Sequence, residues 1–518
     1  MNAIDYTYTK EDFDTVDPYE YLTGITNAFE FEREKKLLTE YAKSVGYKGF
    51  LTMLKAYKES LKDINSSLAT FRPDGISAFE DQPFEFNTGE WNADESGVWR
   101  YGGNGVEVAC SHPIFPCQQM RNVDTSEMKV KLAYRQSPDD RRPWSYILTD
   151  KKTVSDAKRI VDLATFGISI TSGPRAQLLV DYIRDVTDLN RDIIPETKSI
   201  GHLGWNTEGF SPYVKGIVLD GADSFSSVNA AIHSHGDYNE WLVAAYNCRH
   251  YSMTARLVLA SSFASALVSK LGCLPFFVHL WGMDSGTGKT VAQMLAASVW
   301  GDPSVGGPLL PTFKGTSVGF EVLAGFLHSI PLIMDELQLA RDPHGKINFN
   351  VYELASGSGK IRSNVGRGLA PTPRWANCFI TSGETPLVTE SDGAGAVNRV
   401  IEIECKANKK VIEDGHYTAA TLKANYGFAG QIFVEKLQVG NNLEGAQKLY
   451  EYYYEDCLTT NTTEKQAMAA ALILTADCIL SEWFFTGDDH LEATDIAEFL
   501  KSKEAVSAAD RGYQYMCD

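Results

Sequence analysis

One stretch of sequence decides the fold: Pro275-Phe-Phe-Val-His-Leu-Trp-Gly-Met-Asp-Ser-Gly-Thr-Gly-Lys-Thr290. Its apolar run from Phe276 to Leu280 is typical of a buried strand, and the residues from Val291 to Val299 continue with helical character. The glycine-rich loop between them has the setting that a phosphate-binding loop requires. Small residues let backbone N–H groups converge on a phosphate, a lysine neutralises the γ-phosphate, and a hydroxyl holds Mg²⁺.

The loop departs from the usual G-x-x-x-x-G-K-[ST] pattern at one position. The first glycine of that pattern would fall at Met283, whereas the glycine stands one residue earlier, at Gly282. An ordinary glycine-rich turn between a strand and a helix is the alternative, and the Gly-Thr-Gly-Lys-Thr run at this junction argues against it. We therefore expect ATP and Mg²⁺ as cofactors. The predicted nucleotide-binding residues are Asp284, Ser285, Gly286, Thr287, Gly288, Lys289 and Thr290.

A second apolar run, Ile330-Pro-Leu-Ile-Met-Asp-Glu336, ends in two adjacent acids. Such an ending is common at strand termini and means little alone, but here Asp335 follows Thr290 by 45 residues, as expected of a Walker B strand. Successive strand residues point to opposite faces, so the two carboxylates should diverge and take different roles. We expect Asp335 to hold magnesium together with Thr290, and Glu336 to polarise the attacking water.

A third strand, Trp375-Ala-Asn-Cys-Phe-Ile-Thr-Ser382, ends in hydroxyl side chains. In an ATPase core of this topology the central strand ends in a polar residue that senses the γ-phosphate. Thr381 and Ser382 are both candidates, and the sequence does not choose between them. A strand that simply finishes in a turn is the alternative.

Arg399 follows a glycine-rich approach, Gly393-Ala-Gly-Ala-Val-Asn398. We interpret it as an arginine finger, which would reach a neighbouring subunit's ATP and stabilise charge on the transferring phosphoryl group. The alternative is a structural arginine that pairs with a nearby acid at a sheet edge.

A basic segment lies between the second and third strands. No acidic residue occurs from Leu354 to Gly383, and the segment carries Lys360, Arg362, Arg367 and Arg374. Its Gly, Ser and Pro content predicts a protruding hairpin, and basic hairpins facing a channel track a phosphate backbone. These four residues are our DNA-contact candidates, with a solvated surface loop as the alternative.

The length of 518 residues predicts several domains, because single hydrophobic cores stop growing near roughly 250 to 300 residues. We expect a helical N-terminal module at 1–72, an α+β N-terminal domain at 73–240, an ATPase core at 241–406 and a helical region at 407–518. In the core, apolar strands alternate with helices, as in a three-layer α/β nucleotide-binding fold. The stretch from about Ala244 to Leu271 is expected to form one long apolar helix that leads into the first strand.

The net charge of −19 excludes a protein that coats nucleic acid with its whole surface, so any DNA contact must be local. The nine cysteines form no Cys-x-x-Cys pair, which fits a reducing cytoplasm, and a zinc site at Cys110, His112 and Cys117 would lack a second ligand pair. No signal peptide is recognisable at the N-terminus. The most apolar run, Leu257 to Ser269, is shorter than a membrane span, so no membrane partner is expected.

On these residues, the segment from about Gly97 to Asp518 resembles the helicase-like domain of unknown function found in phage and mobile-element replication proteins. Its ATPase core is similar to the AAA+ cores of minichromosome-maintenance helicases. The latter resemblance rests on the loop residues Asp284, Gly286, Thr287 and Lys289. The phage-type resemblance rests on Gly204-Trp205, Thr316, Glu321, Trp375, Ser382-Gly-Glu384 and Gly427-Phe-Ala-Gly430.

The resemblance implies a homo-oligomeric ring, a hexamer, in which Arg399 acts in trans. It also implies that the segment from Lys360 to Arg374 corresponds to a hairpin that contacts DNA. The function expected is an ATP-dependent DNA translocase or helicase in phage or mobile-element replication. An ATP-regulated assembly or loading factor without processive movement is the main alternative, and a packaging or antiviral ATPase is a further one.

Overall fold

A computed structural model describes residues 7–25, 28–58, 75–103, 105–136, 143–221, 225–341, 349–361, 372–388 and 393–506. Contacts divide the chain into two compact units, one formed by residues 1–120 and 128–196 and the other by residues 121–127 and 197–518. We call them unit 1 and unit 2 and describe each by itself. The four domain limits expected from the sequence stay predictions.

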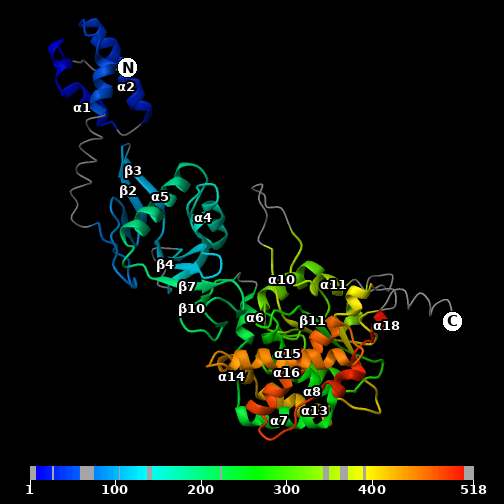
Figure 1. The fold of residues 1–518 in the computed structure, drawn as a ribbon. Coiled ribbons are helices and arrows are strands. Elements are labelled where there is room, and N and C mark those ends of the chain that lie inside the picture. Colours follow the sequence, from blue (N-terminus) through cyan, green and yellow to red (C-terminus); the bar gives the residue numbers. More distant parts are fainter. Residues whose placement is uncertain are drawn as a thin grey trace. The chain divides into compact units, whose positions relative to one another are not determined.

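The N-terminal part of unit 1 is helical. Figure 1 draws it in blue, and its elements are η1 (Glu11–Asp14), α1 (Asp17–Thr23), α2 (Ala28–Ser44) and a further helical stretch over 50–58. Phe13, Tyr19 and Phe50 pack their rings together in a small core, which Leu22 and Leu38 extend. Aromatic pairs of this kind stabilise a small core beyond the area that they bury.

The rest of unit 1 combines strands with helices, as expected from the sequence. A three-stranded antiparallel sheet has the order β1-β2-β3, and β5 pairs with β6 in antiparallel fashion. Helix α5 buries one side, including Leu179, Tyr182, Ile183 and Val186, as its helical spacing predicts. The elements are β1 (Asn92–Asp94), β2 (Gly97–Gly102), β3 (Gly105–Cys110), β4 (Ile114–Asn122), β5 (Met128–Tyr134), β6 (Ser145–Asp150), α4 (Lys151–Val154), η2 (Ile160–Phe166) and α5 (Pro174–Leu189).

Unit 2 begins with short strands and two helices that replace the single helix expected over 244–271. The helix is interrupted at Ser252, where the backbone is extended. The Oγ of Ser252 accepts from the N–H of Ala255 and donates to the carbonyl of Val411. A serine side chain can accept a hydrogen bond from a backbone N–H at a helix start, and the spacing of apolar residues does not reveal such a start. The elements are β7 (Glu196–Ile200), β8 (Gly204–Trp205), β9 (Phe210–Ser211), β10 (Ile217–Leu219), α6 (Ser226–Ala231), α7 (Tyr238–Tyr251) and α8 (Met253–Leu267).

A four-stranded parallel sheet forms the centre of unit 2. Its order is β12-β13-β11-β14, so β13 lies between the strand that precedes the glycine-rich loop and the strand that ends in the two acids. The strands are β11 (Phe276–Trp281), β12 (Leu332–Met334), β13 (Cys378–Gly383) and β14 (Val400–Glu404). Helices α8 and α9 (Lys289–Ser298) contact β13, and α10 (Ser317–Leu327) contacts β12. Burial by such helices explains why β11 is apolar almost throughout.

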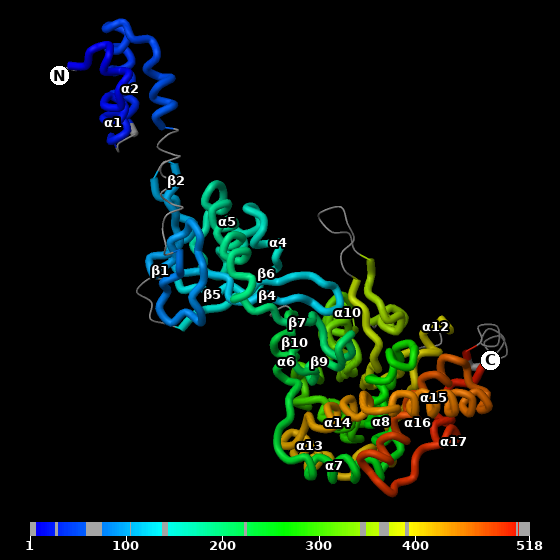
Figure 2. Tube along the Cα trace, turned by 60° about the vertical axis from the view of Figure 1, so that its left-hand side comes forward, coloured from blue at the N-terminus to red at the C-terminus, as the bar shows by residue number. Residues whose placement is uncertain are grey.

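The C-terminal helices share one core with this sheet. Helix α16 packs against both α8 and α15, and the neighbouring course of α15 and α16 is visible in Figures 1 and 2. A single apolar cluster runs from Leu203 to Val506, so residues after 406 do not bury a core of their own. The remaining elements are η4 (Leu337–Ala340), α11 (Val351–Leu354), α12 (Ala394–Val397), α13 (Gly415–Ala424), α14 (Ala429–Leu437), α15 (Asn442–Thr459), α16 (Glu464–Trp483), α17 (Ala493–Ile496), η5 (Ala497–Phe499) and α18 (Lys503–Val506).

The chain is thus a mixed α/β protein with several sheets and many helices, in agreement with the coarse fold expectation. None of the helices in the described ranges combines the length and apolar character needed to cross a bilayer.

Candidate nucleotide-binding site

A cavity of about 810 Å³ opens at the carboxyl ends of β11, β12 and β13. Ligands of parallel α/β sheets bind at this edge, because the loops that follow the strands converge there. Four chain segments line the cavity: the glycine-rich loop, the acids after β12, the end of β13, and the start of α13 with the residues before it. The lining residues include Gly282 to Val291, Asp335, Glu336, Gln338, Ser382 to Glu384, Lys410 and Glu413 to His416.

The glycine-rich loop adopts a conformation that explains its unusual glycine spacing. Gly282 has a φ of 154°, and a Cβ at this position would lie 2.3 Å from the carbonyl oxygen of Cys405. Met283, where the usual pattern has glycine, is instead 87% exposed and therefore free to carry a side chain. Gly288 has a φ of 98° and directly precedes α9, so the helix begins with its N-terminus at the cavity.

The segment after β14 holds the loop in place through three hydrogen bonds donated by its backbone N–H groups. The N–H of Cys405 donates to the carbonyl of Trp281 over 2.7 Å, and that of Val411 donates to the carbonyl of Thr287 over 2.8 Å. Between them, the N–H of Ala407 donates to Oδ2 of Asp284 over 2.9 Å. The Asp284 carboxylate therefore helps to shape the loop.

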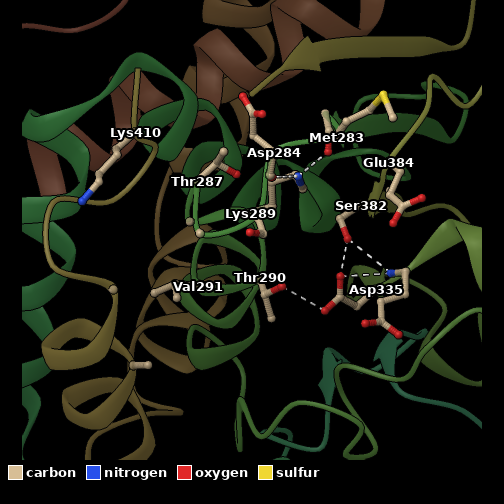
Figure 3. A pocket seen from close by; sticks show the side chains of 18 of the residues that line it. Met283, Asp284, Thr287, Lys289, Thr290, Val291, Asp335, Ser382, Glu384 and Lys410 are labelled. Atoms are coloured by element: carbon tan, nitrogen blue, oxygen red, sulfur yellow. Dashed lines mark hydrogen bonds between the residues drawn. The ribbon is translucent and has the colours of Figure 1, made fainter. Parts of the chain in front are cut away.

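Lys289 lies inside the loop that it terminates, with its ammonium donating to two carbonyls, those of Gly282 at 2.7 Å and Asp284 at 3.1 Å. Figure 3 shows this side chain within the lining of the cavity. A charged phosphate oxygen is a stronger partner for an ammonium than a neutral carbonyl is.

Asp335 is the point at which three segments meet. Its Oδ2 accepts from the hydroxyl of Thr290 over 3.1 Å, and its Oδ1 accepts from the hydroxyl of Ser382. Figure 3 shows Asp335 between these two hydroxyl groups. Asp335 is 5% exposed, and a hydroxyl from α9 and a hydroxyl from β13 fix the orientation of its carboxylate.

Glu336 diverges from Asp335 as expected, but β12 ends at Met334, so the divergence arises at the turn after the strand and not from alternation along it. Its residue is exposed while Asp335 is buried, and its backbone has a φ of 65°, the left-handed region that non-glycine residues rarely adopt. Its N–H donates to Oδ1 of Asp335 over 3.0 Å and to Oγ of Ser382 over 3.3 Å. Such backbone strain costs about 1 to 3 kcal/mol and is found where a site must aim a side chain.

The structure separates the two candidate sensor residues. Ser382 lines the cavity and contacts Asp335, whereas Thr381 is fully buried and its hydroxyl pairs with Nδ1 of His279 at 2.8 Å. The two residues are neighbours on one strand and therefore point to opposite sides. Only Ser382 is placed to meet a ligand.

Arg399 does not line the cavity of its own chain. Its guanidinium donates from Nη1 to the carbonyl of Gly395 over 2.6 Å and lies 4.9 Å from the ring centre of Tyr352. The residue is 9% exposed, and its Nε has no hydrogen-bond partner within the described chain. Among the described residues, no acid forms an ion pair with Arg399, which differs from the structural ion pair considered as the alternative.

The two ends of the basic segment pair with each other, as at the base of a hairpin. Ser358 and Arg374 form an antiparallel bridge, and the N–H of Gly359 donates to the carbonyl of Pro373 over 2.9 Å. Lys360 pairs with Glu353 at 3.0 Å, and Arg374 is exposed. Arg362 and Arg367 lie outside the described residues. A hairpin base is therefore present, and what its tip contacts stays a prediction.

Thr316 and Glu321, two of the residues that carry the resemblance, lie at α10 near the start of the basic segment. The Oγ1 of Thr316 accepts from the N–H of Gly319 over 3.1 Å and so caps α10. Glu321, in the same helix, is buried and accepts from the N–H of Lys360 over 3.4 Å. The contact of Glu321 places α10 against the start of the basic segment.

Sequence reasoning missed the far wall of the cavity, formed by Lys410, Glu413, Asp414 and His416. Asp414 caps α13 by accepting from the N–H of Tyr417 over 2.9 Å. The acid before Gly415 is a signal for a helix start. Nothing local reveals that this helix begins beside a loop more than 120 residues earlier in the chain.

Within the described residues, no cluster of three or more His, Cys, Asp and Glu side chains is arranged to hold a metal ion. His112, considered as a zinc ligand, instead accepts from the N–H of Ser169 through Nε2 over 2.8 Å.

Comparisons with known proteins were made on the sequence and on the fold. No curated protein sequence gives a significant match. Among solved structures, one described as the active helicase Cch of SCCmec type IV is similar with a TM-score of 0.58 and 16% identity, over 84% of this chain and 82% of that chain. A second, the apo C-terminal region of NrS-1, gives a TM-score of 0.27 and 10% identity over 74% of this chain and 90% of that chain, a likeness too low to support an argument.

The first of these similarities shows a shared fold with a helicase structure. The sequence model of the family described as "Domain of unknown function (DUF927)" matches residues 91–372, more than half of the chain. This match confirms the coarse form of the expected resemblance, to a domain of unknown function. The chain belongs to the DUF927 family.

Proposed function

We propose that the protein is an ATP-dependent DNA translocase or helicase of phage or mobile-element replication, with an AAA+ core that hydrolyses ATP between the subunits of a ring. One observation carries the proposal: Lys289, Thr290, Asp335, Glu336 and Ser382 converge on one cavity at the carboxyl ends of neighbouring parallel strands. The fold shared with a structure described as an active helicase supports it.

The residues present fit ATP and Mg²⁺. The N-terminus of α9 and the loop amides suit phosphate oxygens, and the hydroxyl of Thr290 beside the carboxylate of Asp335 is an oxygen donor pair that suits a hard divalent cation. Mg²⁺ usually keeps several waters and binds through one or two protein ligands plus phosphates, so these two residues suffice. When bound, it would supply charge neutralisation at the phosphates.

The chain's own groups then take distinct roles. Lys289 would exchange its carbonyl partners for the phosphates, and Glu336, exposed at the cavity, would orient the attacking water and accept its proton. Ser382 holds Asp335 and would sense the γ-phosphate from the end of β13. Arg399 would leave Gly395 and Tyr352 to act on the ATP of a neighbouring protomer.

Strand displacement tests this proposal against the loading-factor alternative. A forked duplex with one labelled strand is incubated with the protein and MgATP, and the released strand is measured for wild type and for Glu336→Gln. Release by wild type that needs ATP and is lost in the variant supports a motor. Turnover of ATP with no strand release on any fork would favour a loading factor.

A further inference from the structure

A histidine stands in a buried strand of the sheet and has no role in the proposed reaction. His279 is 0% exposed in β11, where its neighbours in sequence are Val278 and Leu280. Burying an imidazole in an apolar strand is costly unless both ring nitrogens find partners. Both do, and the identity of those partners is informative.

The two partners of His279 bracket the tripeptide that lines the cavity. Nδ1 lies 2.8 Å from the hydroxyl of Thr381, the residue before Ser382, and Nε2 lies 2.9 Å from the carbonyl of Thr385, the residue after Glu384. A carbonyl only accepts, so Nε2 carries the hydrogen. In the neutral ring Nδ1 then accepts from the threonine hydroxyl. Burial lowers the pKa of His279 to about 4, against the opposing effect of the Thr385 carbonyl, which agrees with a neutral ring.

The strand register explains how one side chain reaches both ends of the tripeptide. Thr381 of β13, His279 of β11 and Glu402 of β14 are register partners, so they form one row across the sheet. Their side chains share a face, because partners in adjacent parallel strands point the same way. The chain after β13 passes this row, since the carbonyl of Thr385 lies 2.9 Å from Nε2 of His279.

Glu402 binds the next part of the crossing chain. Its Oε1 accepts from the N–H of Leu387 over 2.9 Å and from that of Val388 over 3.2 Å, and Lys501 lies 3.4 Å from its other oxygen. The middle of the tripeptide is also confined, since a Cβ on Gly383 would lie 2.8 Å from Cβ of Leu337. The loop at 383–388 is thus held by hydrogen bonds to two side chains of the sheet, His279 and Glu402.

We infer that His279 is a positioning residue of the ATPase site, which fixes the loop 383–388 so that Ser382 and Glu384 face the cavity. We call the two hydrogen bonds of His279, to Thr381 and Thr385, the clamp. Its catalytic consequence rests on the proposed function, but the clamp itself is a property of the fold. Misplacing a group by about 1 Å can cost about 100-fold in rate, so two lost hydrogen bonds beneath Ser382 should lower turnover more than ATP affinity.

The test compares four variants with wild type. His279→Leu removes both hydrogen bonds, Thr381→Val removes one, and His279→Gln keeps one acceptor and one donor. His112→Leu is the matched control, because His112 is 2% exposed and hydrogen-bonded but lies in unit 1. Each is measured for amide hydrogen exchange at 383–388 without nucleotide, and for kcat and KM with ATP.

Three results are expected. His279→Leu should speed exchange at 383–388 and lower kcat by about 10- to 100-fold, with KM changed by less than about threefold. Thr381→Val should act in the same direction but less, and His279→Gln should recover part of both losses. The control should behave as wild type.

Unchanged exchange at 383–388 in His279→Leu would overturn the clamp whether or not the protein hydrolyses ATP. Faster exchange with wild-type kcat would overturn its catalytic consequence, as would an equal loss in His112→Leu. Failure of the proposed function would look different: wild type itself would show no turnover, while the exchange measurement would still decide the clamp.

Discussion

The hydroxyl of Thr290 donates to Oδ2 of Asp335 over 3.1 Å, and this contact joins the first turn of α9 to the residue that follows β12. The two residues are 45 positions apart in the chain. A hydroxyl and a buried carboxylate at this distance form a small oxygen-rich centre beside the loop that holds Lys289. All of the chemistry proposed for the protein depends on this centre.

The first prediction concerns the hydroxyl itself. Thr290→Val keeps the side-chain shape but removes a ligand for Mg²⁺, so the affinity for MgATP should fall by about 10-fold or more, while binding of ATP in a chelator should change little. Titration of a fluorescent ATP analogue with and without Mg²⁺ measures both. Thr290→Ser, which retains the hydroxyl, should bind as wild type does. If Thr290→Val bound MgATP as tightly as wild type, the metal role of Thr290 would be wrong.

The second prediction tests whether Arg399 acts between subunits. Arg399→Ala should keep nucleotide binding and lower turnover by about 10³-fold, because the loss is confined to transition-state charge. Lys289→Ala should also be inactive. Mixed in one assembly, the two variants should regain part of the activity, since a protomer with an intact loop can meet an intact Arg399 from its neighbour.

A matched mixture serves as its control. Lys289→Ala mixed with Glu336→Gln should stay inactive, because both residues act in the cavity of one chain and every cavity in the mixture lacks one of them. No recovery in the Arg399 mixture, in an assembly shown to contain both variants, would remove the finger assignment. Full turnover by Arg399→Ala alone would do so as well.

The third prediction compares how much Arg374 and Lys360, at the two ends of the basic segment, contribute to DNA binding. Arg374 is exposed, whereas Lys360 is engaged with Glu353 at 3.0 Å. Arg374→Ala should therefore weaken binding to single-stranded DNA more than Lys360→Ala does, and should reduce the salt slope by about one phosphate contact. Fluorescence anisotropy over a salt series measures this slope. Basal ATP turnover should stay at the wild-type level, and an unchanged slope for Arg374→Ala would contradict the DNA contact.

The fourth prediction follows from two buried histidines. Burial lowers the pKa of His279 and of His328 to about 4, below the ordinary value of about 6.5. Between these values the unfolded chain binds protons that the folded chain excludes. The free energy of unfolding should therefore reach its highest value, as far as these two histidines contribute, above about pH 6.5. It should fall as the pH drops toward about 4. Chemical denaturation at about pH 7 and about pH 5 checks the direction, and His279→Gln should show a weaker pH dependence than wild type.

Much of the site could be predicted because its signals are local. A strand, a glycine-rich loop and a helix start within 15 residues fix the place of Lys289 and Thr290, and the apolar run before Asp335 fixes the next strand. Strand alternation predicts that Asp335 and Glu336 diverge, and they do, but the cause is the left-handed backbone of Glu336 beyond the end of β12. The meeting of these segments at one cavity follows from parallel strands having their carboxyl ends at one edge.

The features that escaped prediction depend on contacts between distant parts of the chain. Choosing Ser382 over Thr381 requires the register of β13 against β11, which no single strand encodes. Likewise, the helix expected through Ser252 breaks because Ser252 finds a partner in Val411, far along the sequence. His279 looked like part of an ordinary buried strand, since its partners become visible only when the sheet is assembled.

The most direct test of the central claim is the rate of ATP hydrolysis with and without single-stranded DNA, for wild type and for Lys289→Ala. The account predicts turnover by wild type that single-stranded DNA raises several-fold, and almost none by the variant under either condition. Wild-type turnover that ignores every nucleic acid offered, or turnover that survives the loss of Lys289, would contradict it.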